Sequence, residues 1–417
     1  MFPKIFITIV FLFAFLYPAQ AQFDILNKVK EKVEEKAKEK TGEAIDKATE
    51  PKEEEKEADK KESKNEEMNK DENKSARQTD ELKSYSKYDF IPGEQVLYFD
   101  DFSQDNAGDF PALWNTNSSG EVVTLNNFPG NWFQPGLSGT FLPETKGTFG
   151  ENFTVEFDLI YAPTANSNLP SFDINFFSAK EDEAIDAYVS GNGGCAFRMG
   201  ATAIGAWNWK DQQYGPIDNQ KDNNFLQDNI NKKVRVSFSF QKQRVRFWLN
   251  ENKIFDLPKL LMTNIIIDKF KFITGETDDQ KPYFYITNLR VAVGQPDTRS
   301  KLLTEGKLVT RGILFDVNSD KIKPESYGTL KDIAKVLKDN SNVKVKIVGH
   351  TDSDGNENSN LDLSKRRAVS VKNSLVEEFG IEAGRMETDG KGELEPVSDN
   401  NTPEGKANNR RVEFIKI

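Results

Sequence analysis

The sequence contains almost no cysteine or histidine. Its 417 residues include one cysteine, Cys195, and one histidine, His350. A single cysteine excludes an internal disulfide bond. A single histidine argues against a nucleophile that is activated by histidine. We therefore expect no cofactor, no metal site and no enzymatic activity.

Long apolar runs are also scarce. Residues 5–16 are apolar except for Thr8, but they are fewer than the roughly 20 residues that a membrane-spanning helix needs. They follow Lys4 and precede an A-x-A pattern at residues 19–21, which predicts a secretory signal peptide over residues 1–21. The mature chain would begin at Gln22, and a retained membrane anchor is the alternative. No cysteine follows the apolar run, so we expect no lipid attachment there.

Acidic residues outnumber basic ones over the whole chain. The net charge is −11, and it becomes about −12 if Lys4 is removed with the signal peptide. Nucleic acids attract basic surfaces, so this balance argues against nucleic acid as a partner.

Residues 22–87 are dominated by lysine and glutamate. Apolar residues that predict a narrow amphipathic helix recur four apart at its start: Ile25, Val29, Val33 and Ala37. Gly42 and Pro51 interrupt this pattern, and few apolar residues follow them. We expect a charged tether, partly helical and partly coil, with a coiled coil as the alternative.

Near the C-terminus, a set of short polar motifs follows in a fixed order. They are Ile313-Leu314-Phe315-Asp316, Gly349-His350-Thr351-Asp352, Asn360, Leu363-Ser364, Arg367-Ala368, Gly390-Lys391-Gly392-Glu393 and Asn409-Arg410-Arg411-Val412. Asp352 follows a predicted strand, and Arg367 lies on a predicted helix in one stripe with Asn360 and Leu363. An ionised aspartate accepts from an ammonium, and an arginine fork binds a carboxylate. The two side chains could therefore hold a small zwitterion, although a surface salt bridge between them is the alternative.

This ordered set closely resembles the OmpA-like peptidoglycan-binding domain. The resemblance runs from about Val309 to the C-terminus and implies binding to the meso-diaminopimelate of the cell-wall stem peptide. It assigns the main contacts to Asp352, Arg367, Thr351, Asn360 and Leu363, and secondary contacts to Asp316 and Arg410. The linker and the domain are placed at residues 298–308 and 309–417.

The secondary structure expected for this domain is α+β, in the order β-α-β-α-β-β. Strands are predicted near residues 309–315, 342–349, 385–390 and 411–417. Pro324 suits the first turn of one helix, and Gly380 suits the end of the other. Gly349 and Gly355 are expected to let the loop around Asp352 turn, and His350 to brace it.

Residues 88–297 alternate apolar and polar residues between turns rich in glycine, asparagine and proline. Strands are predicted at residues 153–161, 171–177, 234–240, 244–249 and 283–293. This indicates an all-β domain of about 210 residues. Residues 244–255 and 286–291 resemble parts of concanavalin-like, or laminin-G-like, jelly-roll sandwiches. An outer-membrane barrel in front of the C-terminal domain is the alternative, although several predicted strands are shorter than about 9 residues.

Two kinds of site are considered in the β domain. Glu156 and Asp158 share a strand face, as in the E-x-D-x-x-E pattern of laminarinase-like glucanases, but Tyr161 replaces the last carboxylate. We favour an outer polar face, with a wall-anchored glycan hydrolase as the alternative. Tryptophans that could stack on a sugar, or pack in the core, are Trp132, Trp207 and Trp209.

Taken together, the sequence predicts an exported, non-catalytic protein of the periplasm. The C-terminal domain would anchor it to peptidoglycan, and the β domain would bind a glycan or an envelope protein. The resemblance also implies a place next to the outer membrane.

Overall fold

The structure is a computed structural model that describes part of the chain. It covers residues 88–417 except 146, 165–168, 180–184, 186–187, 189–190 and 295–296. The predicted signal peptide and the predicted tether lie outside these residues. Within the described ranges, no helix has both the length and the apolar character needed to cross a membrane.

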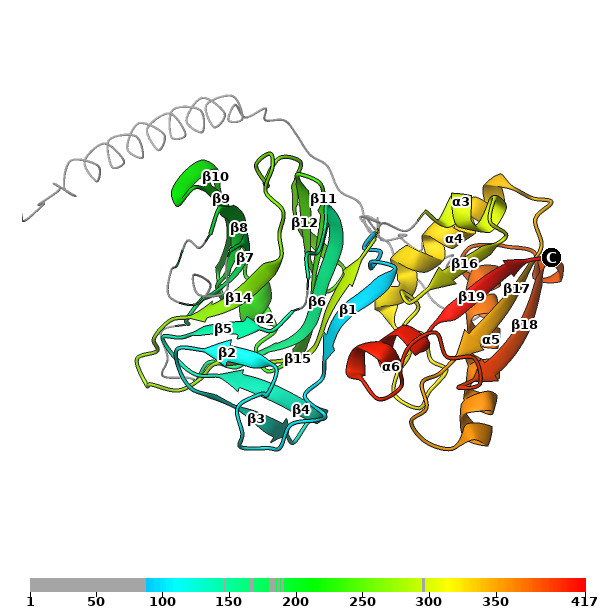
Figure 1. Cartoon of the computed structure of the whole chain (residues 1–417), viewed down its shortest axis with the longest axis horizontal. Coiled ribbons are helices and arrows are strands. Elements are labelled where there is room, and N and C mark those ends of the chain that lie inside the picture. The colour runs from blue at the N-terminus through cyan, green and yellow to red at the C-terminus, as the bar shows by residue number, and fades with distance from the viewer. Residues whose placement is uncertain are drawn as a thin grey trace, which may run out of the picture. The chain divides into compact units, whose positions relative to one another are not determined.

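Strands between residues 95 and 293 form two antiparallel sheets (Figure 1). The first has eight strands, in the order β13-β12-β11-β6-β15-β4-β3 with β1 also paired to β15. Its strands are β1 (Gln95–Asp100), β3 (Gly120–Leu125), β4 (Phe128–Pro135), β6 (Asn152–Tyr161), β11 (Lys233–Gln241), β12 (Arg244–Leu249), β13 (Asn252–Leu257) and β15 (Phe284–Val293). The five predicted strands agree with β6, β7, β11, β12 and β15 to within one residue at each end.

The second sheet has seven strands, in the order β10-β9-β8-β7-β14-β5-β2. Its strands are β2 (Trp114–Thr116), β5 (Thr140–Pro143), β7 (Phe172–Ser178), β8 (Gly193–Met199), β9 (Ala203–Lys210), β10 (Gln213–Asp222) and β14 (Lys269–Thr274). A short helix, α2 (Phe225–Asp228), follows β10.

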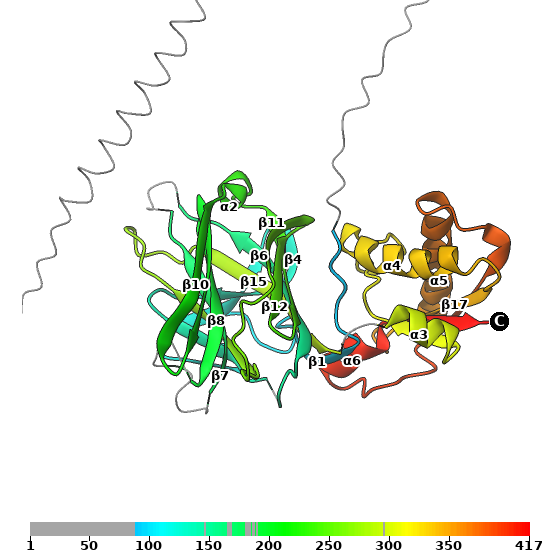
Figure 2. The ribbon, with the colours of Figure 1, turned by 90° about the horizontal axis from the view of Figure 1, so that it is seen from above.

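The two sheets lie face to face and share an aromatic core (Figure 2). Phe176 of β7 lies 5.0 Å from Phe238 of β11, measured between ring centroids, so rings of the two sheets interdigitate. Phe157 of β6 likewise meets Phe272 of β14 at 5.3 Å. The alternating pattern thus produces a two-layer β-sandwich, and its assignment to the jelly-roll kind stays a prediction.

The outward face of the first sheet is covered by the segment that precedes β1. The hydroxyl of Tyr88 lies 3.2 Å from that of Ser237 on β11. The ring of Phe90 packs edge-on against Trp248 of β12 at 5.3 Å. This outward face is therefore buried where these residues cross it.

The C-terminal domain is a four-stranded sheet with helices packed on it, in the strand order β16-β19-β17-β18. Only β17 and β18 pair in parallel. The strands are β16 (Lys307–Thr310), β17 (Val345–His350), β18 (Met386–Gly392) and β19 (Val412–Lys416). The helices are α3 (Thr298–Leu303), the 3-10 turn η2 (Pro324–Ser326), α4 (Tyr327–Asp339), α5 (Glu357–Glu377), the 3-10 turn η3 (Ala383–Arg385) and α6 (Pro403–Asn409).

This domain follows the predicted β-α-β-α-β-β order, with three differences. The first strand ends at Thr310, because the main chain of Leu314 bonds instead to the hydroxyl of Ser326. The expected linker contains α3, whose Leu302 is fully buried in the domain core. The third difference is the additional helix α6, which begins with Thr402 accepting from the main-chain N–H of Gly405.

Strand β1 of the sandwich also contacts helix α6 of the C-terminal domain. The side-chain amide of Asn408 donates to the carbonyl oxygen of Val96 at 2.9 Å. Its carbonyl oxygen accepts from the N–H of Val96 at 3.1 Å. Both pictures show α6 beside β1, and the described residues between 88 and 417 belong to one compact unit (Figures 1 and 2).

Candidate functional site

The acidic half of the candidate site lies directly after β17, and the basic half lies on α5. Asn356 caps α5 by accepting from the N–H groups of Asn358 and Ser359. Gly349 lets α5 lie close to β17, because a Cβ at this position would be 2.3 Å from the carbonyl oxygen of Ser364. Its role is close packing rather than the predicted turn, whereas Gly355, with φ of +101°, does turn the loop.

All seven residues predicted for the site line one cavity of about 380 Å³. They are Asp316, Thr351, Asp352, Asn360, Leu363, Arg367 and Arg410. The hydroxyl oxygen of Thr351 is buried and has no hydrogen-bond partner among the described residues. An unsatisfied polar atom in a cavity wall is typical of a place where a ligand supplies the partner.

Arg367 enters this cavity without a carboxylate partner among the described residues. Its Nε donates to the carbonyl oxygen of Ser319 at 2.9 Å, and its guanidinium lies 4.8 Å from the ring centre of Phe315. Burial lowers the pKa of Arg367 to about 10, although attraction to Asp352 opposes this shift. A desolvated cation of this kind gains from a bound anion.

Asp352 pairs with Arg410 rather than with Arg367. Its Oδ2 accepts from Nη1 of Arg410 at 2.5 Å, and its Oδ1 accepts from the N–H of Asp354 at 3.2 Å. The alternative of a surface salt bridge between Asp352 and Arg367 is wrong, because Asp352 is 8% exposed and pairs with Arg410. Arg410 also lies 5.3 Å from the ring centre of Phe99 on β1.

The sandwich forms the opposite wall of this cavity. Its contribution comprises Phe99, Asp101, Asp158, Arg235, Asn288 and Arg290. The sequence did not indicate this wall, because these residues come from segments far apart in the chain and no motif joins them. The cavity is thus built by two domains.

Glu156 and Asp158 are buried rather than exposed on an outer polar face. Arg235 lies 2.8 Å from the Glu156 carboxylate and 3.0 Å from that of Asp158. Arg290 donates a further hydrogen bond to Glu156. The face of β6 that carries Glu156 and Asp158 does lie opposite the core, as predicted. However, the segment that precedes β1 covers the sheet on this side, and the arginines neutralise the two carboxylates.

The same ion pairs bear on the hydrolase alternative. Burial raises the pKa of Glu156 and Asp158, but Arg235 outweighs it and holds both pKa values below their ordinary range. Retaining hydrolysis needs one carboxyl that stays protonated. The third position is also occupied by Tyr161, whose hydroxyl donates to the carbonyl oxygen of Pro170.

His350 is buried beside Glu413, with 3.7 Å between its Nε2 and the Glu413 carboxylate. Burial opposes ionisation of Glu413, but His350, Lys307 and Arg411 together hold its pKa far below the ordinary value. This position suits the predicted bracing role.

The three tryptophans considered for sugar binding have different surroundings. Trp132 and Trp209 are buried, at 2% and 0% exposure. Trp207 lines a groove of about 400 Å³ with Tyr188 and Arg198. Its ring stacks against Tyr188 with 6.3 Å between centroids, and Arg198 lies 5.4 Å from it.

Comparison with known proteins matches the C-terminal part of the chain. Residues 314–410 fit the family model described as the OmpA family. Outer membrane porin F of Pseudomonas aeruginosa is 45% identical over 101 residues, which are 24% of this chain and 29% of that protein. The probable lipoprotein YiaD of Escherichia coli is 38% identical over 133 residues, which are 29% of this chain and 60% of that protein.

Among solved structures, the cell wall anchor of the T6SS from Pseudomonas aeruginosa is 33% identical, with a TM-score of 0.24. The match covers 27% of this chain and 80% of that one. This chain covers less than two thirds of the two curated relatives named above. Its C-terminal part is an OmpA-family domain, which confirms the predicted resemblance.

Proposed function

We propose that this protein is a non-catalytic anchor of the cell envelope that binds peptidoglycan through its C-terminal domain. Asp352 would accept from the ammonium of meso-diaminopimelate, and Arg367 would bind the carboxylate on the same carbon. The observation that carries this proposal is the shared cavity, where Arg367 has no carboxylate partner among the described residues. The match of residues 314–410 to the OmpA family supports the assignment.

The ion pair between Asp352 and Arg410 leaves room for a ligand. A carboxylate offers about four acceptor positions, and Asp352 uses two of them, one for Arg410 and one for the N–H of Asp354. A ligand ammonium can therefore share the carboxylate with Arg410. Thr351, Asn360 and Leu363 would complete the contacts, with Asp316 beside Arg367.

The proposed location is the periplasm, with export directed by the signal peptide over residues 1–21. Relatives of the C-terminal domain are named as outer-membrane proteins, which supports a place next to that membrane. In this setting the charged residues 22–87 would serve as a tether.

Asp352 and Arg367 together are called the clamp. Pull-down with purified sacculi tests whether the clamp binds peptidoglycan. Asp352→Ala and Arg367→Ala should each weaken binding at least about 30-fold, because each removes one partner of a desolvated charge contact. Arg366→Ala is the matched control, since Arg366 neighbours Arg367 but is exposed and pairs with Asp362. Sacculus binding that survives in both cavity variants would refute the assigned site.

The sandwich is proposed to bind a glycan or a protein partner at the groove beside Trp207. Indole Nε1 of Trp207 is buried without a hydrogen-bond partner among the described residues, while Tyr214 in the same groove is 67% exposed. Stacked rings with polar neighbours suit a sugar. A glycan array with the full chain and with Trp207→Ala tests this, and binding unaffected by the substitution would exclude the groove.

A further inference from the structure

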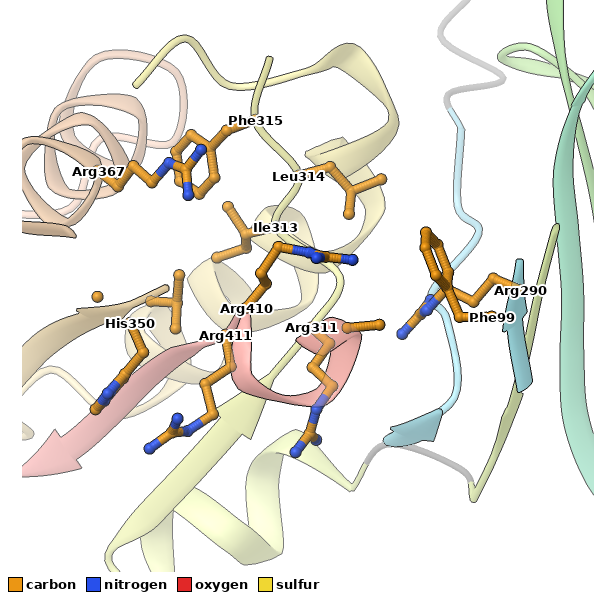
Figure 3. Close-up of a pocket in the computed structure, with 13 residues that line it drawn as sticks. Phe99, Arg290, Arg311, Ile313, Leu314, Phe315, His350, Arg367, Arg410 and Arg411 are labelled. Carbon is orange, nitrogen blue, oxygen red and sulfur yellow. The ribbon is translucent and has the colours of Figure 1, made fainter. Parts of the chain in front are cut away.

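A second cavity, of about 130 Å³, adjoins the clamp and is lined by arginines (Figure 3). They are Arg290, Arg311, Arg367, Arg410 and Arg411. The lining residues shared with the larger cavity include Phe99, Arg367 and Arg410, so the two spaces are neighbours. The cavity is small compared with the roughly 300 Å³ or more of pockets for drug-sized ligands, so it suits a single small group.

Positive charge in this second cavity is only partly neutralised. Arg411 pairs with Glu413 at 2.9 Å, and Arg410 pairs with Asp352. Arg311 instead donates to the carbonyl oxygens of Asn408 and Glu94, which carry no net charge. No aspartate or glutamate is among the described residues that line the cavity.

Arg290 provides a second observation that points to a bound anion in this cavity. It comes from β15 of the sandwich, is 6% exposed, and uses one terminal nitrogen for Glu156. The other terminal nitrogen, Nη2, is buried and has no hydrogen-bond partner among the described residues. Figure 3 shows the Arg290 side chain beside Phe99, on the side of the cavity that faces Arg410 and Arg311. A buried donor without an acceptor is costly, and an arriving acceptor removes that cost.

We propose that this cavity binds a second carboxylate of the wall peptide, next to the diamino acid held in the clamp. Arg290 and Arg311 are the donors, because guanidinium groups match the planar shape and the charge of a carboxylate. The carboxylate belongs either to the C-terminus of the stem peptide or to its acidic residue. This inference rests on the proposed function, since the clamp brings the peptide to the cavity. It makes the sandwich part of the peptidoglycan site.

Calorimetric titration of the full chain with soluble muropeptides tests the subsite. Three ligands are compared: one with free carboxylates, one amidated at the C-terminus, and one amidated at the acidic residue. Unaltered protein should bind one of the two amides about tenfold or more weakly than the free acid, which identifies the carboxylate. This comparison needs no substitution, so it does not depend on the folding of any variant.

Two variants then assign the donors. Arg290→Gln and Arg311→Gln should bind the free acid and the discriminated amide with similar affinities. The control Arg244→Gln, which changes an exposed arginine of β12 paired with Asp256, should discriminate as unaltered protein does. Equal binding of all three peptides by unaltered protein overturns the subsite but leaves the clamp intact. Undiminished discrimination in both variants overturns the assigned donors. No binding of any peptide overturns the proposed function itself.

Discussion

The sandwich and the C-terminal domain both bury arginines, but they satisfy them in different ways. Arg235 of the sandwich lies within 3.0 Å of two carboxylates. Arg367 of the C-terminal domain bonds to main-chain carbonyl oxygens, which leave its charge uncompensated. A buried ion with its counter-ions in place belongs to the fold, whereas one without them can take a charged ligand. Arg235 is therefore structural, whereas Arg367 is available for binding.

The largest effect on stability is expected from replacing these two arginines, which tests whether Arg235 and Arg367 differ in role. Arg235→Met should lower the free energy of unfolding by about 3–5 kcal/mol, because it leaves Glu156 and Asp158 buried without their main counter-ion. Arg367→Met should change it by less than about 1 kcal/mol, because it removes an uncompensated charge. Urea unfolding measures both.

The control for Arg235→Met is Arg244→Met, which removes an exposed partner of Asp256, a carboxylate that is itself partly exposed. Its cost should be far smaller than that of Arg235→Met. A loss of stability in Arg367→Met as large as that in Arg235→Met would show that the two arginines have the same structural role.

A second comparison uses carboxylates instead of arginines. Burial raises the pKa of Asp100 on β1 to about 6, although hydrogen bonds from Trp114, Phe102 and Tyr98 oppose the shift. The folded state therefore holds this proton more tightly than the unfolded state does. Its contribution to stability is full below pH 3.8 and is lost as the pH rises to about 6, amounting to about 3 kcal/mol.

The measurement is the free energy of unfolding of the unaltered chain and of Asp100→Asn at pH 4 and pH 7. The unaltered chain should lose about 3 kcal/mol relative to the variant over this interval. Glu413 has the opposite direction, because its pKa is lowered and its contribution is lost on acidification. Parallel profiles for the two chains would contradict the assignment to Asp100.

Disturbing the packing between β17 and α5 should cause a loss of stability of intermediate size. Gly349→Ala places a Cβ 2.3 Å from the carbonyl oxygen of Ser364, so α5 must move and stability should fall by about 1–3 kcal/mol. Sacculus binding should fall with it, because α5 carries Arg367. Gly384→Ala is the matched control, since its nearest atom would be 3.6 Å away. Thermal unfolding that is equal in both variants would argue against close packing at Gly349.

The smallest effect is expected at the rim of the larger cavity. Lys406 pairs with Asp354 at 2.7 Å, but the two side chains are 28% and 64% exposed. Lys406→Ala should therefore cost less than about 1 kcal/mol in urea unfolding. A larger loss would mean that the surface of the C-terminal domain holds structural ion pairs like those of the sandwich.

The sequence predicted the C-terminal half of the site because its geometry is local. Asp352 at a strand end and Arg367 on the following helix are fifteen positions apart, and β17 and α5 bring both to one cavity. The pairing of Asp352 with Arg410 was not predictable from spacing, since it depends on where α6 ends. Helix α6 itself had a signal in Thr402-Pro403 that the predicted strand order overlooked.

The sandwich half of the site could not be predicted for a different reason. Alternation in β6 separates Glu156 from Phe157, but it does not reveal what covers the second face of the sheet. Phe99 and Arg290 meet because β1 pairs with β15, with Phe99 opposite Arg290. Such a register between distant strands is set by tertiary packing and leaves no pattern in either segment.

The contact between Asn408 and Val96 also bears on aggregation. Strand β1 pairs with β15 along one edge, and an unpaired edge can recruit a strand from another molecule. At Val96 the carboxamide of Asn408 takes the place of a neighbouring strand, since it satisfies both the N–H and the carbonyl oxygen. Proteolytic loss of the C-terminal domain would uncover this edge. The C-terminal domain thus satisfies this edge of the sandwich at Val96, where a strand of another molecule could otherwise pair.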